Sequence, residues 1–133
     1  MTAVLHETPL KELSIAGGLA GFPDSTRYVL VEVPEAAPLF VLRSLDQDGL
    51  EFVVVPPSLF FSDYTPVIDD ASAARLGIAD ASQALVLVVL TIGSEASSTT
   101  ANLLAPIVIH EASRQAAQIV LDADWPLRAP LNG

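Results

Sequence analysis

The chain has 133 residues, of which 51% are apolar, and this length supports one domain, residues 1–133, with a substantial core. Its 16 acidic residues outnumber 6 basic ones, and the resulting formal net charge of −10 disfavours binding to nucleic acid or to anionic membranes. Cysteine is absent, which excludes disulfides and thiolate metal sites.

Short β-branched runs separated by turn residues predict an all-β chain, and their spacing favours a small antiparallel β-barrel or sandwich. The run 85–90 has no polar alternation, which predicts a strand that is buried on both faces. The eight predicted strands are, in chain order, 12–15, 27–33, 39–44, 51–55, 84–92, 99–104, 107–111 and 115–122.

Two connections between these strands have recognisable local signals. The sequence Asp-Gln-Asp-Gly at 46–49 is similar to the opening of a calcium loop, but Glu51 comes too soon for the EF-hand pattern, so we expect a hairpin turn. Residues 71–76 predict one short helix. Asp69 or Asp70 can cap its start, and Gly77 can take the left-handed conformation after its last turn.

The longest uninterrupted apolar run, 84–90, is far shorter than the roughly 20 residues that a membrane-spanning helix needs. The first residues also lack the basic start and cleavage pattern of a signal peptide. We therefore expect a cytoplasmic, monomeric globular protein. The excess of acids has two interpretations: it keeps an apolar-rich chain in solution, or it attracts a basic protein partner.

Catalytic signals are weak in this sequence. No serine stands in a G-x-S-x-G elbow, and no glycine-rich phosphate loop follows a predicted strand. Of the two histidines, His6 is expected in a mobile N-terminus, and His110 is expected to be satisfied by a neighbour at a strand end. Two separated histidines do not supply the clustered ligands of a zinc site. We predict no enzyme activity, no metal and no cofactor.

Acidic residues gather around the predicted helix, and this group is either a solvated face or a surface that docks a partner. Its members are Asp63, Asp69, Asp70 and Asp80. We take Asp63, Asp69 and Asp70, together with Tyr64, as the candidate partner-binding residues.

Three aromatic residues, Phe60, Phe61 and Tyr64, lie in a loop-like stretch between two prolines. Loop aromatics either plug the end of a barrel or anchor an interface. Tyr64 is expected to be the most exposed of the three, because its hydroxyl requires water or a partner. Trp125 is expected to pack its ring on the barrel with the indole directed outward.

Asn102 stands inside the otherwise apolar run 99–109. A buried amide without hydrogen-bond partners costs roughly 1–3 kcal/mol. We expect the Asn102 side chain to bond backbone at a strand end or bulge, where Pro106 blocks further pairing, with direct contact to a partner as the alternative.

The pattern T-x-N-L-x-A-P-I-x-I at 100–109, which contains Asn102 and Pro106, resembles the signature stretch of the flagellar assembly factor family FliW. Other motifs of that family have counterparts in the same chain order. They are G-L-x-G-F at 18–22, L-Q-S as L-R-S at 42–44, F-V-V-x-x-P at 52–57, F-x-x-D-Y at 60–64, Q-V-V-L as Q-I-V-L from Gln118, and Y-x-x-R-x-P-L as W-x-x-R-x-P-L with Trp125 and Arg128. The resemblance covers nearly the whole chain. It departs from the family pattern at Arg43, His110 and Trp125.

The resemblance implies a function and two partners. FliW-type proteins bind the RNA-binding translational regulator CsrA and hold it off flagellin messenger RNA, and they also bind flagellin, which titrates them away from CsrA. It thus implies no direct binding of nucleic acid by this chain. From the residues alone, two other classes stay open: a ligand-binding module or enzyme with its site at the barrel mouth, and a purely structural adaptor.

Overall fold

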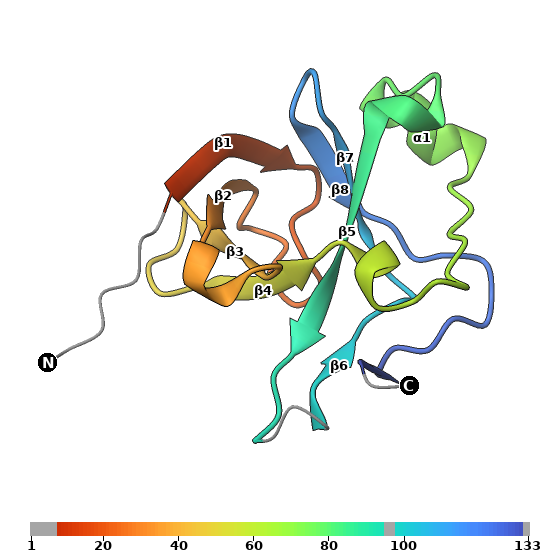
Figure 1. Ribbon diagram of the computed structural model, residues 1–133. Coiled ribbons are helices and arrows are strands. Elements are labelled where there is room, and N and C mark those ends of the chain that lie inside the picture. Colours follow the sequence, from red (N-terminus) through yellow and green to blue (C-terminus); the bar gives the residue numbers. More distant parts are fainter. Residues whose placement is uncertain (1–7, 95–97, 132–133) are drawn as a thin grey trace, which may run out of the picture.

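The computed structural model describes residues 8–94 and 98–131, and the regular secondary structure in this part of the chain is mainly β-strand (Figure 1). One α-helix, α1 (Asp70–Leu76), lies within the described ranges, with the short 3-10 helices η1 (Pro34–Ala36), η2 (Pro57–Leu59) and η3 (Ala81–Gln83). The strands are β1 (Thr8–Ile15), β2 (Arg27–Glu32), β3 (Phe40–Ser44), β4 (Glu51–Val55), β5 (Ala84–Thr91), β6 (Thr100–Ala101), β7 (Ile107–His110), β8 (Gln115–Gln118) and β9 (Ala129–Pro130).

Seven strands close into a barrel in the order β4-β3-β2-β1-β8-β7-β5, because β5 pairs back with β4. β6 and β9 continue the sheet from β5 outside this ring. The predicted all-β barrel with one short helix is confirmed. One pairing in the ring is parallel, between β1 and β8, whereas the others are antiparallel. A closed ring with an odd number of strands cannot alternate direction throughout, so one parallel pair is unavoidable.

The central strand β5 is covered on both sides, as its uninterrupted apolar sequence predicts. Leu87 belongs to the main core inside the barrel. Val88 and Leu90 belong to a second cluster, which also takes in the aromatic residues of the loop after β4. Because β5 also pairs with β4, β6 and β7, the run 84–90 has neighbours along its edges as well as on its faces, and the first polar residue of the strand is the exposed Thr91 at its end.

Large side chains fill the interior of the barrel. Ile15, Tyr28, Leu42, Leu87 and Ile107 are fully buried there. The interior of a barrel with about eight strands is just wide enough for side chains to fill it. Within the described ranges, the Tyr28 hydroxyl is the one buried side-chain polar atom without a hydrogen-bond partner.

The helix α1 begins and ends where the sequence predicts. The Asp69 carboxylate accepts a hydrogen bond of 3.0 Å from the backbone N–H of Ser72, which caps the first turn. Gly77 has a φ of 75° and ends the helix in the left-handed region. Leu76 packs with Val108 and other buried residues in a third cluster, so the helix covers one side of the barrel beside β7 and β8.

Two predicted strands are shorter than expected by several residues, β1 begins four residues before the predicted 12–15, and one strand was missed. The predicted strand 99–104 is reduced to β6, because Asn102 Oδ1 accepts hydrogen bonds from Leu104 N at 3.1 Å and Ala105 N at 3.0 Å. These bonds turn the chain and remove the two N–H groups from a ladder. The predicted strand 115–122 ends at Gln118 in β8. β9 has two residues, too few to produce a strand pattern in the sequence.

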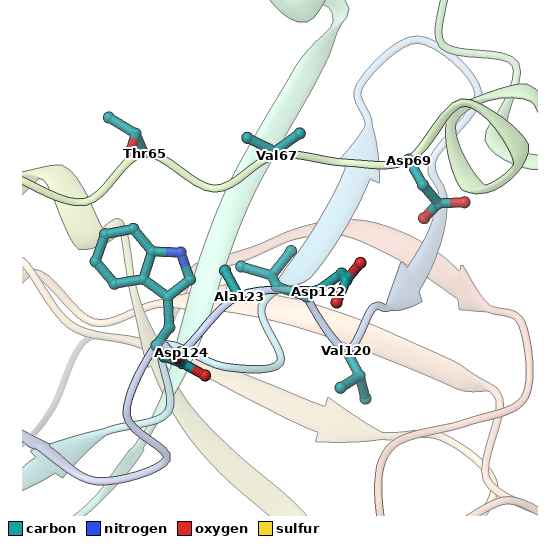
Figure 2. Close-up of a pocket in the computed structure, with 9 residues that line it drawn as sticks. Thr65, Val67, Asp69, Val120, Asp122, Ala123 and Asp124 are labelled. Carbon is teal, nitrogen blue, oxygen red and sulfur yellow. The ribbon is translucent and has the colours of Figure 1, made fainter.

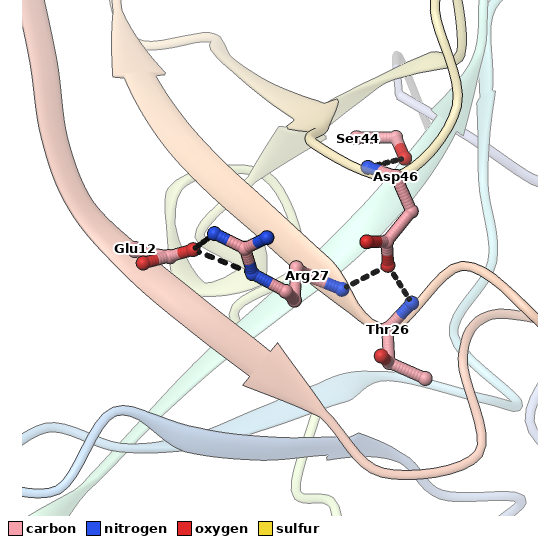
Figure 3. Close-up of polar contacts among 5 residues, drawn as sticks. All are labelled: Glu12, Thr26, Arg27, Ser44 and Asp46. Atoms are coloured by element: carbon pink, nitrogen blue, oxygen red, sulfur yellow. Dashed lines mark hydrogen bonds and ion pairs between the residues drawn. The ribbon is translucent and has the colours of Figure 1, made fainter.

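The turn after β3 is a hairpin turn, as predicted, with Gly49 at a φ of 81°. Its Asp46 carboxylate accepts hydrogen bonds of 2.9 Å from the backbone N–H groups of Thr26 and Arg27 (Figure 3). These backbone donors, first Arg27 and then Thr26, lower the pKa of Asp46. The Arg27 guanidinium donates to Glu12 Oε1 at 2.6 and 3.0 Å. Asp46 therefore ties the hairpin turn to the start of β2.

Candidate partner-binding groove

A surface groove runs between the extended segment 65–69 and the segment 120–125 that follows β8 (Figure 2). Its volume is about 790 Å³. Three aspartates and no basic residue line it. The lining residues of this acidic groove are Thr65, Val67, Asp69, Val120, Leu121, Asp122, Ala123, Asp124 and Trp125.

The carboxylates of Asp69 and Asp122 extend into the space between the two segments (Figure 2). Asp69 is held in place as the helix cap, because its Oδ1 also accepts a hydrogen bond of 2.6 Å from the Ser72 hydroxyl. The hydrogen bonds from the Ser72 hydroxyl and the Ser72 backbone lower the pKa of Asp69. The groove therefore presents a fixed negative charge at neutral pH.

Exposed apolar side chains accompany these acids. Val67 is 79% exposed and Val120 is 72% exposed, whereas Leu121 is buried at 5% and contributes to the floor of the groove. Both valine side chains point away from the space between the two segments (Figure 2), so they add exposed apolar surface at the borders of the groove.

An aromatic pair braces one wall of the groove. The rings of Tyr64 and Trp125 meet edge to face, with their centroids 4.8 Å apart. The Tyr64 hydroxyl donates a hydrogen bond of 2.7 Å to the carbonyl oxygen of Leu103, and burial raises the pKa of Tyr64 to about 12.

The expectation that Tyr64 is the exposed aromatic residue is therefore wrong, because its hydroxyl forms a hydrogen bond with the backbone of Leu103 in the same chain. Phe60, Phe61 and Tyr64 are all half-buried on the second cluster, which favours the plug over the interface anchor. Trp125 is also half-buried and packs on the barrel.

Only some of the partner-binding residues predicted from the sequence belong to the acidic groove. Asp69 lines the groove, and Tyr64 supports its wall through Trp125. Asp63 and Asp70 are exposed but do not line it, and Asp70 borders a separate hollow beneath α1. Sequence reasoning missed Asp122 and Asp124, because it placed Asp122 at the end of a strand. The pair of acids directly before Trp125 was the available signal.

The motif residues lie at a structural junction. Gln118 Oε1 accepts a hydrogen bond of 2.7 Å from Ala20 N, and its Nε2 donates to the carbonyl oxygen of Ala105 at 3.1 Å. Pro106 is fully buried, and its carbonyl oxygen accepts from Ile119 N at 3.0 Å. Gln118 thus joins the 18–22 turn to the 100–109 stretch. Arg128 is exposed in the segment that leads to β9.

The two histidines are the candidate bases and metal ligands that the sequence offers. His110, at the end of β7, pairs its Nδ1 with the Ser113 hydroxyl at 2.9 Å, which is the satisfied strand-end histidine that was predicted. His6 lies outside the described residues. Within 8–94 and 98–131, no group of three or more His, Asp or Glu side chains could hold a metal ion. No helix in those ranges is long and apolar enough to cross a membrane.

Comparison with known proteins gives a consistent result. The model of the FliW protein family matches residues 3–131. The flagellar assembly factor FliW of Exiguobacterium sp. is 36% identical over 121 residues, which cover 91% of this chain and 83% of that protein. FliW of Bacillus subtilis is 32% identical over 117 residues, covering 87% and 82%. A crystal structure of a flagellar assembly factor FliW superimposes with a TM-score of 0.86 at 29% identity and covers 92% of this chain and 86% of that one.

Proposed function

The chain belongs to the FliW family of flagellar assembly factors, and from this premise we propose that it binds the translational regulator CsrA and also binds flagellin. In this proposal the protein acts in the cytoplasm as a monomer. It occupies CsrA and so releases flagellin messenger RNA for translation. Newly made flagellin competes for the protein, and CsrA returns to the message when flagellin accumulates. Flagellin synthesis then follows flagellin assembly.

Charge supports the CsrA part of the proposal. A protein that binds RNA needs a basic surface to neutralise phosphates, and this chain has a net charge of −10. Opposite charges steer two proteins together and raise their association rate. Once the pair has formed, acids close to the RNA path disfavour RNA. Screening limits this effect to a Debye length of about 8 Å at physiological salt.

The acidic groove is the observation that carries the proposed docking site. It combines three aspartates with exposed Val67 and Val120, whereas a merely solvated acidic face would not need apolar side chains beside its charges. The alternative, a ligand-binding module or enzyme with its site at the barrel mouth, gains no support from the barrel interior, which is filled by core side chains.

The experiment measures CsrA binding by surface plasmon resonance and tests the groove with two matched variants. The groove variant is Asp69→Asn, Asp122→Asn and Asp124→Asn. The control variant neutralises three exposed acids elsewhere, Asp24→Asn, Asp48→Asn and Glu111→Gln. Both change the net charge from −10 to −7. Asparagine at position 69 keeps the helix cap, because it caps as well as aspartate.

We expect the groove variant to associate with CsrA at least about tenfold more slowly than the control variant, and rising salt to narrow the difference. A separate double variant, Asp63→Asn with Asp70→Asn, tests the two acids outside the groove. The binding of a flagellin leader RNA to CsrA is measured with and without this protein. Tight RNA binding by this protein alone, or no interaction with the CsrA of its own organism, would refute the proposal.

A further inference from the structure

One edge of the segment after β8 is paired and the other is open. Ile119 N donates to the carbonyl oxygen of Pro106 at 3.0 Å, and Leu121 N donates to that of Leu104 at 2.8 Å. Successive backbone groups in an extended segment point to opposite sides. The N–H and C=O of Val120 therefore point away from 104–106. Neither group has a hydrogen-bond partner in the part of the chain that the structure describes.

The segment across the groove is open in the same way. Residues 65–69 are extended, between the turn at Tyr64 and the cap of α1. The backbone groups of Thr65 and Val67 form no hydrogen bond with any described residue. The acidic groove thus lies between two segments that each carry unpaired backbone groups, at Thr65 and Val67 on one side and at Val120 on the other. Such unpaired edges are templates for the addition of another strand.

We propose that the acidic groove receives an extended segment of a protein partner, which pairs main chain to main chain with Val120. This inference rests on the proposed partner-binding function and specifies how the groove recognises its partner. Strand addition gives affinity through backbone hydrogen bonds, and the side chains on alternate positions give specificity.

The lining of the groove defines the chemistry of the incoming segment. Asp69, Asp122 and Asp124 select lysine or arginine at alternate positions. The exposed side chains of Val67 and Val120 point away from the space between the two segments (Figure 2), so they offer apolar contact to those side chains of the partner that extend past the groove. A second copy of this chain is excluded as the occupant by like-charge repulsion at a net charge of −10. A helical segment is excluded as well, because its backbone groups are already paired within the helix and cannot bond Val120.

Nuclear magnetic resonance tests this mode with a defined probe. The ¹⁵N-labelled protein is titrated with an acetylated, amidated hexapeptide of alternating lysine and valine. We expect chemical-shift changes concentrated at the amides of Val67, Val120 and Asp122, with slower hydrogen exchange at Val120. A hexapeptide of alternating glutamate and valine should bind at least about tenfold more weakly, because its charges are repelled. The lysine–valine peptide with alternate backbone nitrogens methylated should lose binding to the same extent, because it cannot pair.

A pair of variants examines the same bond from the protein side. Val120→Pro removes the N–H group that pairs, and it breaks no native hydrogen bond because that group has no partner in the described chain. Val120→Ala keeps the N–H and removes only apolar surface. We expect the proline variant to bind the peptide at least about tenfold more weakly than the alanine variant. If the proline variant fails to fold, the methylated peptide decides the question.

The outcomes separate this inference from the proposed function. Strand addition is refuted if the methylated and unmethylated peptides bind equally, or if the chemical-shift changes lie away from the groove. Either result leaves the proposed binding of CsrA to be decided by the surface plasmon resonance experiment. Peptide pairing at Val120 in a protein that has no affinity for CsrA upholds strand addition and refutes the proposed function.

Discussion

Replacing Asn102 with alanine should lower the stability of the fold without touching the groove. The side-chain oxygen of Asn102 accepts hydrogen bonds from Leu104 N and Ala105 N, at 3.1 and 3.0 Å. Ala105 is 7% exposed, so water cannot readily replace the lost acceptor at its N–H. A buried donor that loses its partner costs roughly 1–3 kcal/mol. The half-buried Leu104 adds less, and we expect a total loss of about 2 kcal/mol.

Thermal unfolding followed by circular dichroism measures this loss. For a chain of this length, 1 kcal/mol corresponds to roughly 3–5 °C in the melting temperature, so Asn102→Ala should melt roughly 6–10 °C below the parent. Asn102→Asp is the matched control, because aspartate keeps an oxygen in the accepting position. It should recover most of the loss at neutral pH.

An unchanged melting temperature in Asn102→Ala, combined with lost binding to CsrA, would refute this reasoning. That result would make Asn102 an interface residue, which is the alternative that its place in an apolar run leaves open. Equal losses in the alanine and aspartate variants would instead show that the accepting oxygen is not what stabilises the turn.

Three further predictions concern the barrel. The pKa of Asp46 is lowered in the folded state, so its negative charge stabilises the fold at pH values above the ordinary carboxyl pKa of about 4. This contribution is lost as the pH falls through the folded pKa of Asp46. The melting temperatures of the parent and of Asp46→Asn should therefore differ at pH 7 and converge by about pH 2. Gly18→Ala should lower the melting temperature far more than Gly17→Ala does. Both glycines have positive φ, but only at Gly18 would the new Cβ overlap the carbonyl oxygen of Phe22. A melting temperature of Gly18→Ala within about 2 °C of the Gly17→Ala value would contradict this. Tyr28→Phe should leave the free energy of unfolding unchanged or raise it by up to about 1 kcal/mol, because the buried hydroxyl has no hydrogen-bond partner among the described residues. A clear decrease in the free energy of unfolding, measured by chemical denaturation, would instead indicate a water bound to this hydroxyl.

The elements of the barrel were predictable because their signals are local. The uninterrupted run in β5 identified a strand buried on both faces, and Asp69 and Gly77 gave the ends of α1 correctly. The prediction that a strand continues past Asn102 was wrong, and the reason is also local. The amide side chain competes for the backbone N–H groups that a ladder would use, and β propensity alone does not include this competition.

The groove was less predictable because it depends on two segments that are distant in sequence. Asp69 and Asp122 meet only after the helix cap and the end of β8 have been placed against the same side of the barrel. The sequence pattern directed attention to the acids next to the helix, and so Asp63 was grouped with Asp69 although it does not line the groove. The exposure of Val67 and Val120 has no sequence signal, because valine in an extended segment is ordinarily taken as buried.

The motif residues and the groove residues divide between two tasks. Asn102, Pro106 and Gln118 satisfy backbone groups within the fold, so their resemblance to the FliW pattern accounts for a shared barrel. None of these three lines the groove. In the proposed docking mode, contacts with a partner come instead from residues such as Asp122 and Val120, which lie outside the paired core of the sheet. It follows that variants of the motif should reduce stability and binding together, whereas variants of the groove should reduce binding alone.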